Sequence, residues 1–497
     1  MTAHSKQPFP APLALLFLLC LFGTGCTTRS GYRPVTKENR GGLDIAHYED
    51  DPKVAVPRRE SAFLEKYNHD NFWLGHVEMT DYGSYQRNDG QLSQLEHAVE
   101  TEARNGLFQR GVTVIVFVHG WDNNAQENNR NLRNFRSLLA RAAGGEKRDG
   151  RGVLGVYLSW RGKSLAKPLK AFTYWGRGRA AETIGQGIMV EVLARIRNIH
   201  WLVAEGARSR GRSRQGIYQN SRLVLIGHSF GGRALYNAVA AGMETNFLQP
   251  YWAARSFPQA QGHRAVQIQM RRASGFGDLV LLINPAIKSL PYRKIDYAMR
   301  SNTTVNYDPK QPVLMMVLSA TNDTPNKSYL PVGEMFGNRF RDVTAPQSAR
   351  TEAKQNVTAL GHFQRFHSHR LVERNGRVEL QRVPEFFTYR GLPVKTLRSR
   401  LMQLDGVITD PEPGLLPYMM VSVDPKIING HSGFWPDKNP LAYQFVESFI
   451  SAQNRAVGAA RKDQGPMSEA GVVPAGLPAP SQRAAPPPPV STESRDD

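Results

Sequence analysis

The chain has 497 residues, of which 40% are hydrophobic, and a formal net charge of +20 at neutral pH. Its length suits one large domain with extensions or two domains, and its two cysteines are too few for a zinc finger or a disulfide-rich fold. The mean hydropathy of −0.44 and the 32 prolines indicate sizeable polar segments beside the core. A basic surface suits anionic membranes, anionic glycans or nucleic acid, and the charge alone does not choose among them.

The first 25 residues have the pattern of a signal peptide. Lys6 precedes an apolar run from Ala11 to Phe22, which is short for a bilayer span of about 20 residues. Residues 23–28, Gly-Thr-Gly-Cys-Thr-Thr, resemble the bacterial lipoprotein processing site, although Gly23 stands where that site usually has an aliphatic residue. The resemblance implies that Cys26 becomes a lipidated first residue, and the alternative is an ordinary signal peptide with a chance cysteine.

A lipidated Cys26 would hold the protein stably on a membrane, because two or more acyl chains anchor where one does not. Thr27 follows this cysteine in place of the aspartate typical of inner-membrane retention. The resemblance therefore implies the bacterial cell envelope, at the outer membrane and facing the periplasm. If Cys20 leaves with the signal peptide, the exported domain has no disulfide.

Residues 26–70 are polar and charged with little periodicity, and we expect a tether with a few ordered pieces. From residue 71 to 86 the pattern predicts a strand pair with a turn near Asp81 to Gly83. Leu92, Leu95 and Val99 then predict a helix that ends near Gly106.

Buried strands and amphipathic helices alternate in the part that follows. Continuous apolar runs predict strands at 112–118, 153–159, 223–226, 279–283, 313–318 and 418–423. Helical spacing predicts three helices in this part. The first contains Leu132, Phe135, Leu138 and Leu139 and ends before Gly144, the second contains Ile184, Ile188, Val192 and Ile196, and the third covers about 440–451. Helices between buried strands predict an α/β fold with a mostly parallel central sheet and helices on both faces.

Two long segments interrupt this alternation. Residues 244–276 are basic, and an insert of about 324–415 contains a possible strand pair near 377–387. Such inserts could form a cap over a site. After about residue 455 the chain is rich in Pro, Ala and Ser, so we expect a domain over 71–455 and a disordered tail over 456–497.

The run Leu223 to Ile226 leads into Gly227-His-Ser229-Phe-Gly231, which fits G-x-S-x-G, and helical spacing resumes at Ala234. Strand, sharp turn and helix form the context in which this motif presents a nucleophilic serine. Glycines at both ends allow the strand and the helix to approach closely. The alternative is a glycine-rich turn in which Ser229 only caps the helix.

A strand also leads directly into His119-Gly120-Trp121-Asp122, and a late His431 stands between the final strand and the final helix. Together with the serine motif, these features resemble the alpha/beta-hydrolase superfamily over roughly residues 71–452. The His-Gly pair resembles the oxyanion loop of lipases and esterases. The resemblance implies an oxyanion hole made by the backbone N–H groups of Trp121 and Phe230. For His119 we prefer a role in holding the loop.

In this superfamily the order along the chain is Ser, then Asp or Glu, then His, which implies His431 as the base. The acid should follow the strand 313–318, where Asp323 stands, and it would orient the imidazole. Asp323 could instead be only a turn residue. Asp278 is the second candidate, but it begins a strand, the wrong end for such a site.

Three other histidines, His362, His367 and His369, lie in the insert, with Glu373 as the nearby carboxylate. A local hydrogen-bond network is the simpler interpretation, and metal binding is the weaker one. We expect no metal or organic cofactor. The arginine-rich loop from Arg208 to Arg214 and the pair Arg271-Arg272 could face an anionic lipid surface or could simply be solvated.

The sequence thus predicts a membrane-tethered serine hydrolase that cleaves carboxylic esters, an esterase or lipase, through Ser229, Asp323 and His431. Amide, thioester and acyl-transfer chemistry remain open because they share this machinery. The alternative function is a non-catalytic envelope-binding lipoprotein on a hydrolase scaffold. Nucleic acid is not an expected partner, since no recognition motif accompanies the charge.

Overall fold

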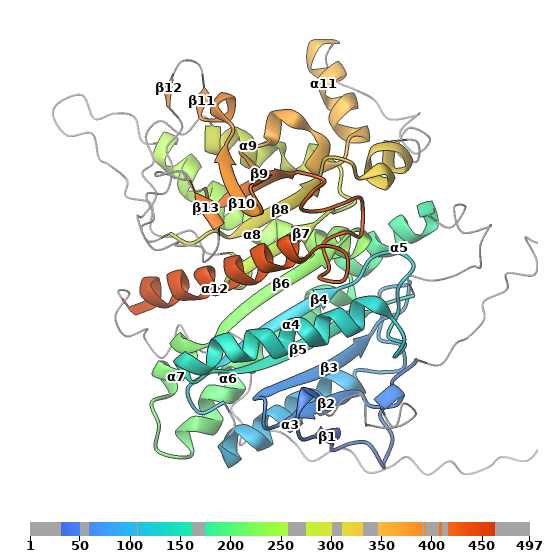
Figure 1. The fold of residues 1–497 in the computed structure, drawn as a ribbon, viewed down its shortest axis with the longest axis vertical. Helices are drawn as coiled ribbons and strands as arrows, with labels where there is room; N and C mark the ends of the chain where they lie inside the picture. The colour runs from blue at the N-terminus through green and yellow to red at the C-terminus, as the bar shows by residue number, and fades with distance from the viewer. Residues whose placement is uncertain are drawn as a thin grey trace, which may run out of the picture.

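The computed structural model describes residues 31–49, 59–106, 108–161, 174–256, 275–300, 311–331, 346–389, 392–393, 407–409 and 416–462. These residues form an α/β structure around one 12-stranded sheet, with strand order β1-β2-β3-β5-β4-β6-β7-β8-β14-β9-β10-β13 (Figure 1). The bounds of the central strands are β3 Phe72–Glu78, β5 Gly152–Ser159, β4 Val112–Val118, β6 Arg222–His228, β7 Leu279–Ile283, β8 Met315–Ala320 and β14 Tyr418–Val423.

The centre of the sheet is parallel throughout. From β3 to β14, and on to β9 (His369–Arg374), every neighbouring pair runs in the same direction. Every residue of β3, β4, β5, β6, β7, β8 and β14 is buried. Continuous apolar runs give this result because both faces of the sheet are covered by helices. The predicted mostly parallel sheet with helices on both faces is confirmed.

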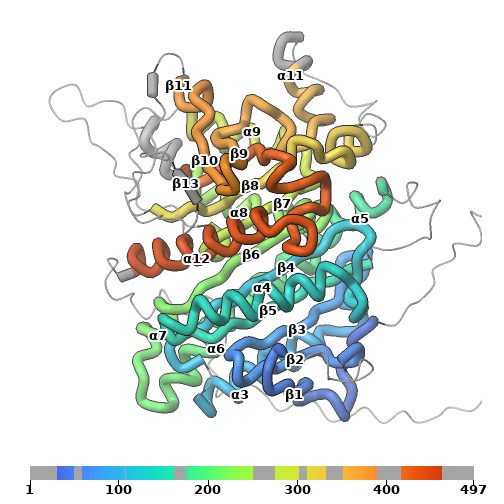
Figure 2. The backbone as a smooth tube through the Cα atoms, viewed as in Figure 1, coloured from blue at the N-terminus to red at the C-terminus, as the bar shows by residue number. Residues whose placement is uncertain are grey.

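Helices α4 (Arg130–Glu146) and α12 (Pro440–Lys462) cover one face, and they lie side by side although they come from distant parts of the chain (Figure 2). The other face is covered by α3 (Gly90–Asn105), α5 (Tyr174–Gln186), α6 (Ile188–Arg208) and α8 (Phe230–Ser256). Close packing needs small residues at two strand positions. A Cβ at Gly75 would meet Leu95 of α3, and one at Gly155 would meet Leu139 of α4.

The remaining elements lie around this core. Their bounds are β1 Leu43–Ile45, β2 Leu64–Tyr67, η2 Lys147–Asp149, α7 Arg214–Asn220, η4 Leu290–Tyr292, α9 Arg293–Arg300, η5 Pro325–Tyr329, α11 Pro346–Val357, η6 Leu360–His362, η7 Gln364–Phe366, β10 Arg377–Arg382, η8 Pro384–Phe386, β11 Thr388–Tyr389, β12 Leu392–Pro393 and β13 Val407–Thr409. Among the described helices, none combines the length and the apolar character that a bilayer crossing requires.

The prediction of a tether with a few ordered pieces over residues 26–70 understates the order of its described part. Strand β2 pairs antiparallel with β3, and β1 pairs parallel with β2, so this segment forms one end of the sheet. A buried ion cluster holds it there. Arg33, with no exposed surface, donates hydrogen bonds to Glu65 and Glu127, and Arg136 of α4 binds both carboxylates as well. Burial alone would raise the pKa of Glu65, but the adjacent Arg136 keeps it well below its usual value.

The predicted C-terminal boundary is also wrong. Helix α12 continues past residue 455 to Lys462, and Arg461 in its last turn forms an ion pair with Asp278. The amide of Gln453 donates to the carbonyl groups of Asp278 and Val313 at the start of the neighbouring strands. The tail prediction for residues 463–497 lies outside the described residues.

Four further expectations need correction. The residues predicted to form a strand pair over 71–86 form one strand, β3, followed by a single bridge between Met79 and Tyr85. Helix α4 includes Gly144 and Gly145, and the helix predicted through Ile184 is two helices separated at Gly187. The insert over 324–415 adds β9 and β10 to the main sheet, so this part of it is not a cap. Residues 257–274 of the segment 244–276 lie outside the described part, and Ser256 ends α8.

Candidate active site

Ser229 occupies a sharp turn between β6 and α8. Its backbone φ is +56°, a left-handed value that is rare for a residue with a side chain. Neighbouring glycines permit this turn: a Cβ at Gly227 would lie 2.7 Å from the Cα of Gly232, and one at Gly231 would collide with the carbonyl of Val118. The predicted close approach of strand and helix around the serine is therefore observed.

The three residues predicted to act together do meet. The Ser229 Oγ lies 2.7 Å from the His431 Nε2, and the His431 Nδ1 lies 2.8 Å from the Asp323 Oδ1. They come from the carboxyl ends of β6, β8 and β14, which lie at one edge of the sheet. Ser229 is 3% exposed, while the His431 side chain is 19% exposed, so solvent reaches the imidazole more readily than the serine.

The protonation of Asp323 sets the direction of these hydrogen bonds. Burial would raise the pKa of this carboxyl, but the hydrogen bond and charge of His431, the nearby His362 and the N–H of Asn326 together outweigh burial, so the pKa lies below the usual value. An ionised carboxylate only accepts, so the His431 Nδ1–H donates to it. The Nε2 of the neutral imidazole is then an acceptor, and it faces the hydroxyl of Ser229. This is the arrangement in which a histidine takes a proton from serine.

The loop that carries His431 is fixed by side chains that the sequence did not single out. The Nε2–H of His228 donates to the His431 carbonyl at 2.9 Å, and the Nδ2 of Asn284 donates to the same carbonyl at 2.8 Å and to that of Gly430 at 3.1 Å. The side-chain carbonyl of Asn322 accepts the N–H of Gly430 at 2.8 Å. Burial, followed by the proximity of His431, lowers the pKa of His228 to about 3, so His228 is a neutral donor.

Asn326 connects the acid to this support. Its Nδ2 donates to the second carboxylate oxygen of Asp323 at 2.7 Å and to the backbone carbonyl of Asn284 at 2.9 Å. Asn284 is fully buried at a φ of +43°, and its Oδ1 accepts the N–H of Ala320 at the end of β8. Asn284 directly follows the end of β7, which is the only sequence signal that could have indicated it, whereas Asn326 lies in η5, six residues beyond the end of β8.

The loop after β4 packs directly against the serine. A Cβ at Gly120 would lie 2.6 Å from the Ser229 Cβ and 2.9 Å from the His228 carbonyl. His119 holds this loop through two hydrogen bonds. Its Nε2 accepts the N–H of Trp160, so the proton of the neutral ring is on Nδ1, which donates to the carbonyl of Gly120 at 2.9 Å. Burial lowers the pKa of His119 to about 4. The preferred structural interpretation of His119 agrees with these contacts.

Trp121 and Phe230, the two predicted oxyanion donors, lie around a shared aromatic neighbour. The ring of Tyr174 is 5.5 Å from that of Trp121 and 4.7 Å from that of Phe230, measured between centroids. The ring of Tyr329, in η5, also lies 5.7 Å from that of Tyr174. Phe230 is the first residue of α8, so its N–H belongs to the helix end that favours negative charge.

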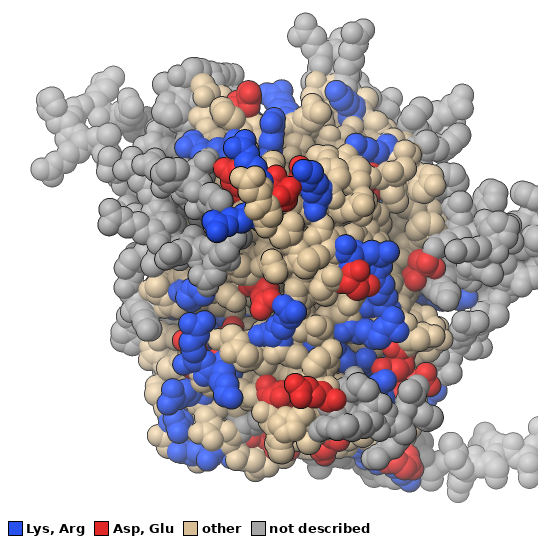
Figure 3. Space-filling model, viewed as in Figure 1, with Lys and Arg blue, Asp and Glu red and all other residues tan. Residues whose placement is uncertain are grey.

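Several other predicted candidates lie away from this arrangement. Asp278 binds Arg461 and the N–H of Leu223 at the amino ends of the strands, opposite Ser229, which rules it out as the acid of this triad. The arginine-rich loop between α6 and α7 lies at the same far edge, where basic side chains gather at the lower left of Figure 3. Two of its arginines, Arg208 and Arg214, pair with Glu205. Cys26 and Arg271-Arg272 lie outside the described residues.

The histidines of the insert make different hydrogen bonds, although His362 and His367 line the same cavity. His367 bonds the carbonyl of Gly361, and His369 contacts the hydroxyl of Ser368. His362, whose pKa burial lowers to about 4, lines a cavity of about 300 Å³ together with Asn326. Within the described ranges, no three His, Cys, Asp or Glu side chains group in a way that would hold a metal ion.

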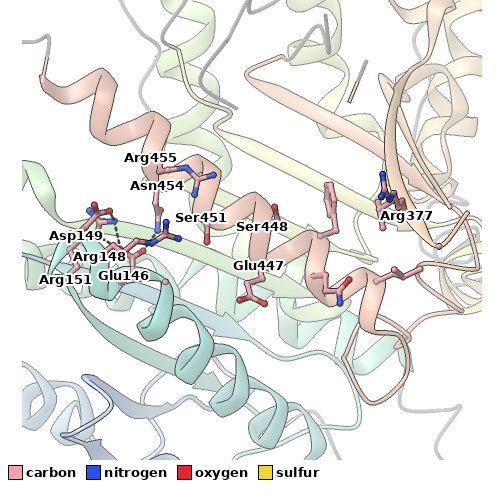
Figure 4. Close-up of a pocket in the computed structure, with 16 residues that line it drawn as sticks. Glu146, Arg148, Asp149, Arg151, Arg377, Glu447, Ser448, Ser451, Asn454 and Arg455 are labelled. Atoms are coloured by element: carbon pink, nitrogen blue, oxygen red, sulfur yellow. Dashed lines mark hydrogen bonds and ion pairs between the residues drawn. The ribbon is translucent and has the colours of Figure 1, made fainter. Parts of the chain in front are cut away.

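A second cavity of about 480 Å³ lies between the end of α4, the length of α12 and the turn between β9 and β10. Figure 4 shows Arg148 and Arg151 at one end of this cavity and Arg377 at the other, with Ser448, Ser451 and Arg455 projecting from α12 between them. None of its lining residues belongs to the triad or supports it.

The geometry therefore brings together a serine, an imidazole and a carboxylate, with a close glycine loop beside the serine. Comparisons with protein-family models, with curated proteins and with solved structures find no match to this chain.

Proposed function

We propose that this protein is a serine hydrolase that cleaves carboxylic esters, an esterase or lipase with an alpha/beta-hydrolase fold. One observation carries the proposal: His431 bridges the Ser229 Oγ at 2.7 Å and the Asp323 Oδ1 at 2.8 Å. In such a chain the imidazole can take the serine proton while the carboxylate orients the ring and stabilises the imidazolium.

In the proposed reaction the imidazole takes the serine proton as the Oγ attacks an ester carbonyl. Asp323 stabilises the imidazolium that forms, and its lowered pKa keeps it ionised at neutral pH. The protonated imidazole then gives the proton to the leaving alcohol and an acyl-enzyme remains. The same nitrogen activates water, which releases the acid and restores the hydroxyl of Ser229.

The backbone N–H groups of Trp121 and Phe230 are the proposed oxyanion donors. Support comes from Gly120, which brings the loop after β4 against the Ser229 Cβ, and from the position of Phe230 at the start of α8. A helix N-terminus places unpaired N–H groups and a partial positive charge where the oxyanion would form.

The fold supports the same assignment. The serine follows a strand in the middle of a mostly parallel sheet, and the acid and the base follow the ends of two later strands. This is the chain order Ser, Asp, His that the alpha/beta-hydrolase superfamily uses. We further propose that Cys26 is lipidated and holds the enzyme at the periplasmic side of the outer membrane.

A fluorophosphonate probe and a short p-nitrophenyl ester test the activity on the protein lacking residues 1–26. We expect covalent labelling and turnover that Ser229→Ala abolishes with an unchanged thermal unfolding midpoint. Ser328, exposed in η5, supplies the matched control, and Ser328→Ala should retain both signals. Labelling that survives in Ser229→Ala, or no labelling of the unmodified protein, would overturn the proposal and favour a non-catalytic binding protein.

A further inference from the structure

The first described residues lie next to the active-site edge of the sheet, which is the edge formed by the carboxyl ends of the parallel strands and which carries Ser229. Glu78, the last residue of β3, accepts the backbone N–H groups of Tyr32 at 2.9 Å and Arg33 at 2.8 Å. Gly31 lies against the same carboxylate, since a Cβ there would be 2.9 Å from the Glu78 Oε1. The chain therefore enters the fold at the carboxyl ends of the strands, on the edge that holds Ser229.

This entry point limits where the anchor can be. Five peptide units join Cys26 to Gly31, and an extended chain gains at most about 3.5 Å per residue, so the two residues lie within roughly 17 Å of each other. Strand β3 is three positions from β6 in the sheet, which corresponds to roughly 14 Å between the strand ends. A lipid chain on Cys26 would consequently enter the bilayer within roughly 30 Å of Ser229.

The same edge carries exposed aromatic and apolar side chains. Tyr82, in the turn after β3, is 83% exposed, and Tyr329, in η5 after β8, is 48% exposed. Val190, at the start of α6, is 47% exposed and lies near the turn of Tyr82, because Gly187 packs against Gly83.

Two exposed cations accompany these side chains. Arg87 follows the turn of Tyr82, and Lys327 precedes Tyr329 in η5. Tyrosine beside lysine or arginine is the pattern of a surface that meets lipid head groups. Since Tyr82 and Tyr329 follow strands on opposite sides of β6, the pattern extends across Ser229.

We infer that the active-site edge, with Tyr82, Val190 and Tyr329 exposed on it, rests on the bilayer to which Cys26 is anchored, and that the substrate is an acyl ester resident in that bilayer. The inference rests on the proposed ester hydrolysis and on the proposed lipidation. It also places the arginine-rich loop of residues 208–214 at the far end of the domain, away from the membrane.

The orientation is tested without using turnover. The full chain carrying Ser229→Ala, lipidated and reconstituted in phosphatidylethanolamine–phosphatidylglycerol vesicles, receives one thiol at a time, because Cys20 and Cys26 are its only cysteines. Tyr82→Cys tests the edge, and Tyr297→Cys is the matched control, 44% exposed on α9. Labelled with an environment-sensitive fluorophore, Tyr82→Cys should be quenched by nitroxide lipids and Tyr297→Cys should not. Equal quenching at both positions, or none at Tyr82→Cys, overturns the orientation.

The substrate class is tested by comparing two esters. Tethering raises the local concentration of enzyme at the bilayer, so Cys26→Ser should lower hydrolysis of a fluorogenic phospholipid ester in vesicles by about tenfold or more. Hydrolysis of the soluble p-nitrophenyl ester should be unchanged. If the soluble ester is hydrolysed but the vesicle ester is not, or if Cys26→Ser affects neither, the substrate inference fails while the hydrolase proposal stands. If Ser229-dependent hydrolysis of both esters is absent, the proposed function itself fails, and so does the substrate inference built on it.

Discussion

Replacing Asn284 with aspartate tests how the histidine loop is held. The substitution Asn284→Asp keeps the size of the side chain, its tolerance of a φ of +43° and its acceptor for the N–H of Ala320. It removes the amide that donates to the carbonyl groups of Gly430 and His431. Only the hydrogen-bond donor and the charge change.

The loss can be estimated from these contacts. Two hydrogen bonds contribute about 1 kcal/mol each to the free energy of unfolding. An ionised carboxylate at this fully buried position would face two carbonyl oxygens, so its pKa would rise, and each unit of rise costs about 1.4 kcal/mol at neutral pH. With a rise of about two units, the total destabilisation is roughly 5 kcal/mol.

Urea unfolding at two pH values measures this effect. Because the folded variant would hold its proton more tightly than the unfolded chain, the destabilisation should be about 2 kcal/mol near pH 4, from the lost hydrogen bonds, and should grow as the pH rises to about 6. Asn429→Asp is the matched control, on the same loop but exposed, and it keeps the acceptor that Asn322 uses. Its effect should stay within about 0.5 kcal/mol.

Ester turnover provides the second measurement. A displaced His431 carbonyl moves the imidazole away from the 2.7 Å contact with Ser229, and a misplacement of about 1 Å can lower kcat about a hundredfold. An Asn284→Asp protein with native stability at pH 7.5 and native kcat would refute the positioning role of Asn284.

Three further predictions follow from other parts of the structure. A methyl group at Gly120 would lie 2.6 Å from the Ser229 Cβ. Gly120→Ala should therefore lower kcat/KM for the ester about a hundredfold while the circular dichroism spectrum stays the same. Native kinetics in this variant would contradict the prediction. Arg136→Met removes one of the cations that pair with the buried carboxylate of Glu65, and it should lower the free energy of unfolding, measured in urea, by about 3–5 kcal/mol. A change under about 1 kcal/mol would argue against the role of the ion cluster. Burial lowers the pKa of His200 from 6.5 to about 4. As the pH falls, the imidazole of His200 is therefore protonated in the unfolded chain before it is protonated in the folded protein, and the free energy of unfolding decreases between pH 6.5 and about pH 4. Replacement by glutamine, which keeps an N–H donor, should recover about 3 kcal/mol at pH 4, and equal pH slopes in the two proteins would contradict the assignment.

The sequence predicted the central strands well because their burial is nearly complete. Val112–Val118, Leu279–Ile283 and Tyr418–Val423 have the predicted bounds, since a continuous apolar run between polar residues leaves few alternatives. The positions of Ser229, Asp323 and His431 followed from the same strands, because Ser229 and Asp323 stand just beyond strand ends and His431 lies in the loop between the final strand and the final helix. Their meeting is a consequence of parallel pairing, which places those ends together.

Element boundaries that depend on distant partners were not predicted. Helix α4 continues through Gly144 and Gly145 because Glu146, beyond them, binds Arg151 and Asn454. The supports of the histidine loop were missed for the same reason. Asn284 and Gly430 are 146 positions apart, and nothing local to either residue indicates that they bond.

The last turn of α12 determines how much of the C-terminal region the fold can lose. Arg461 forms an ion pair with Asp278, 183 positions earlier in the chain, and the other carboxylate oxygen of Asp278 accepts the N–H of Leu223 at the beginning of β6. A protease that cuts beyond Lys462 would leave this connection intact. A cut at residue 455 would remove the arginine and leave a carboxylate, 7% exposed, without its counter-ion at the base of the strand that presents the serine. The C-terminal border of the described fold is therefore set by an ion pair, although the change in composition lies earlier in the chain.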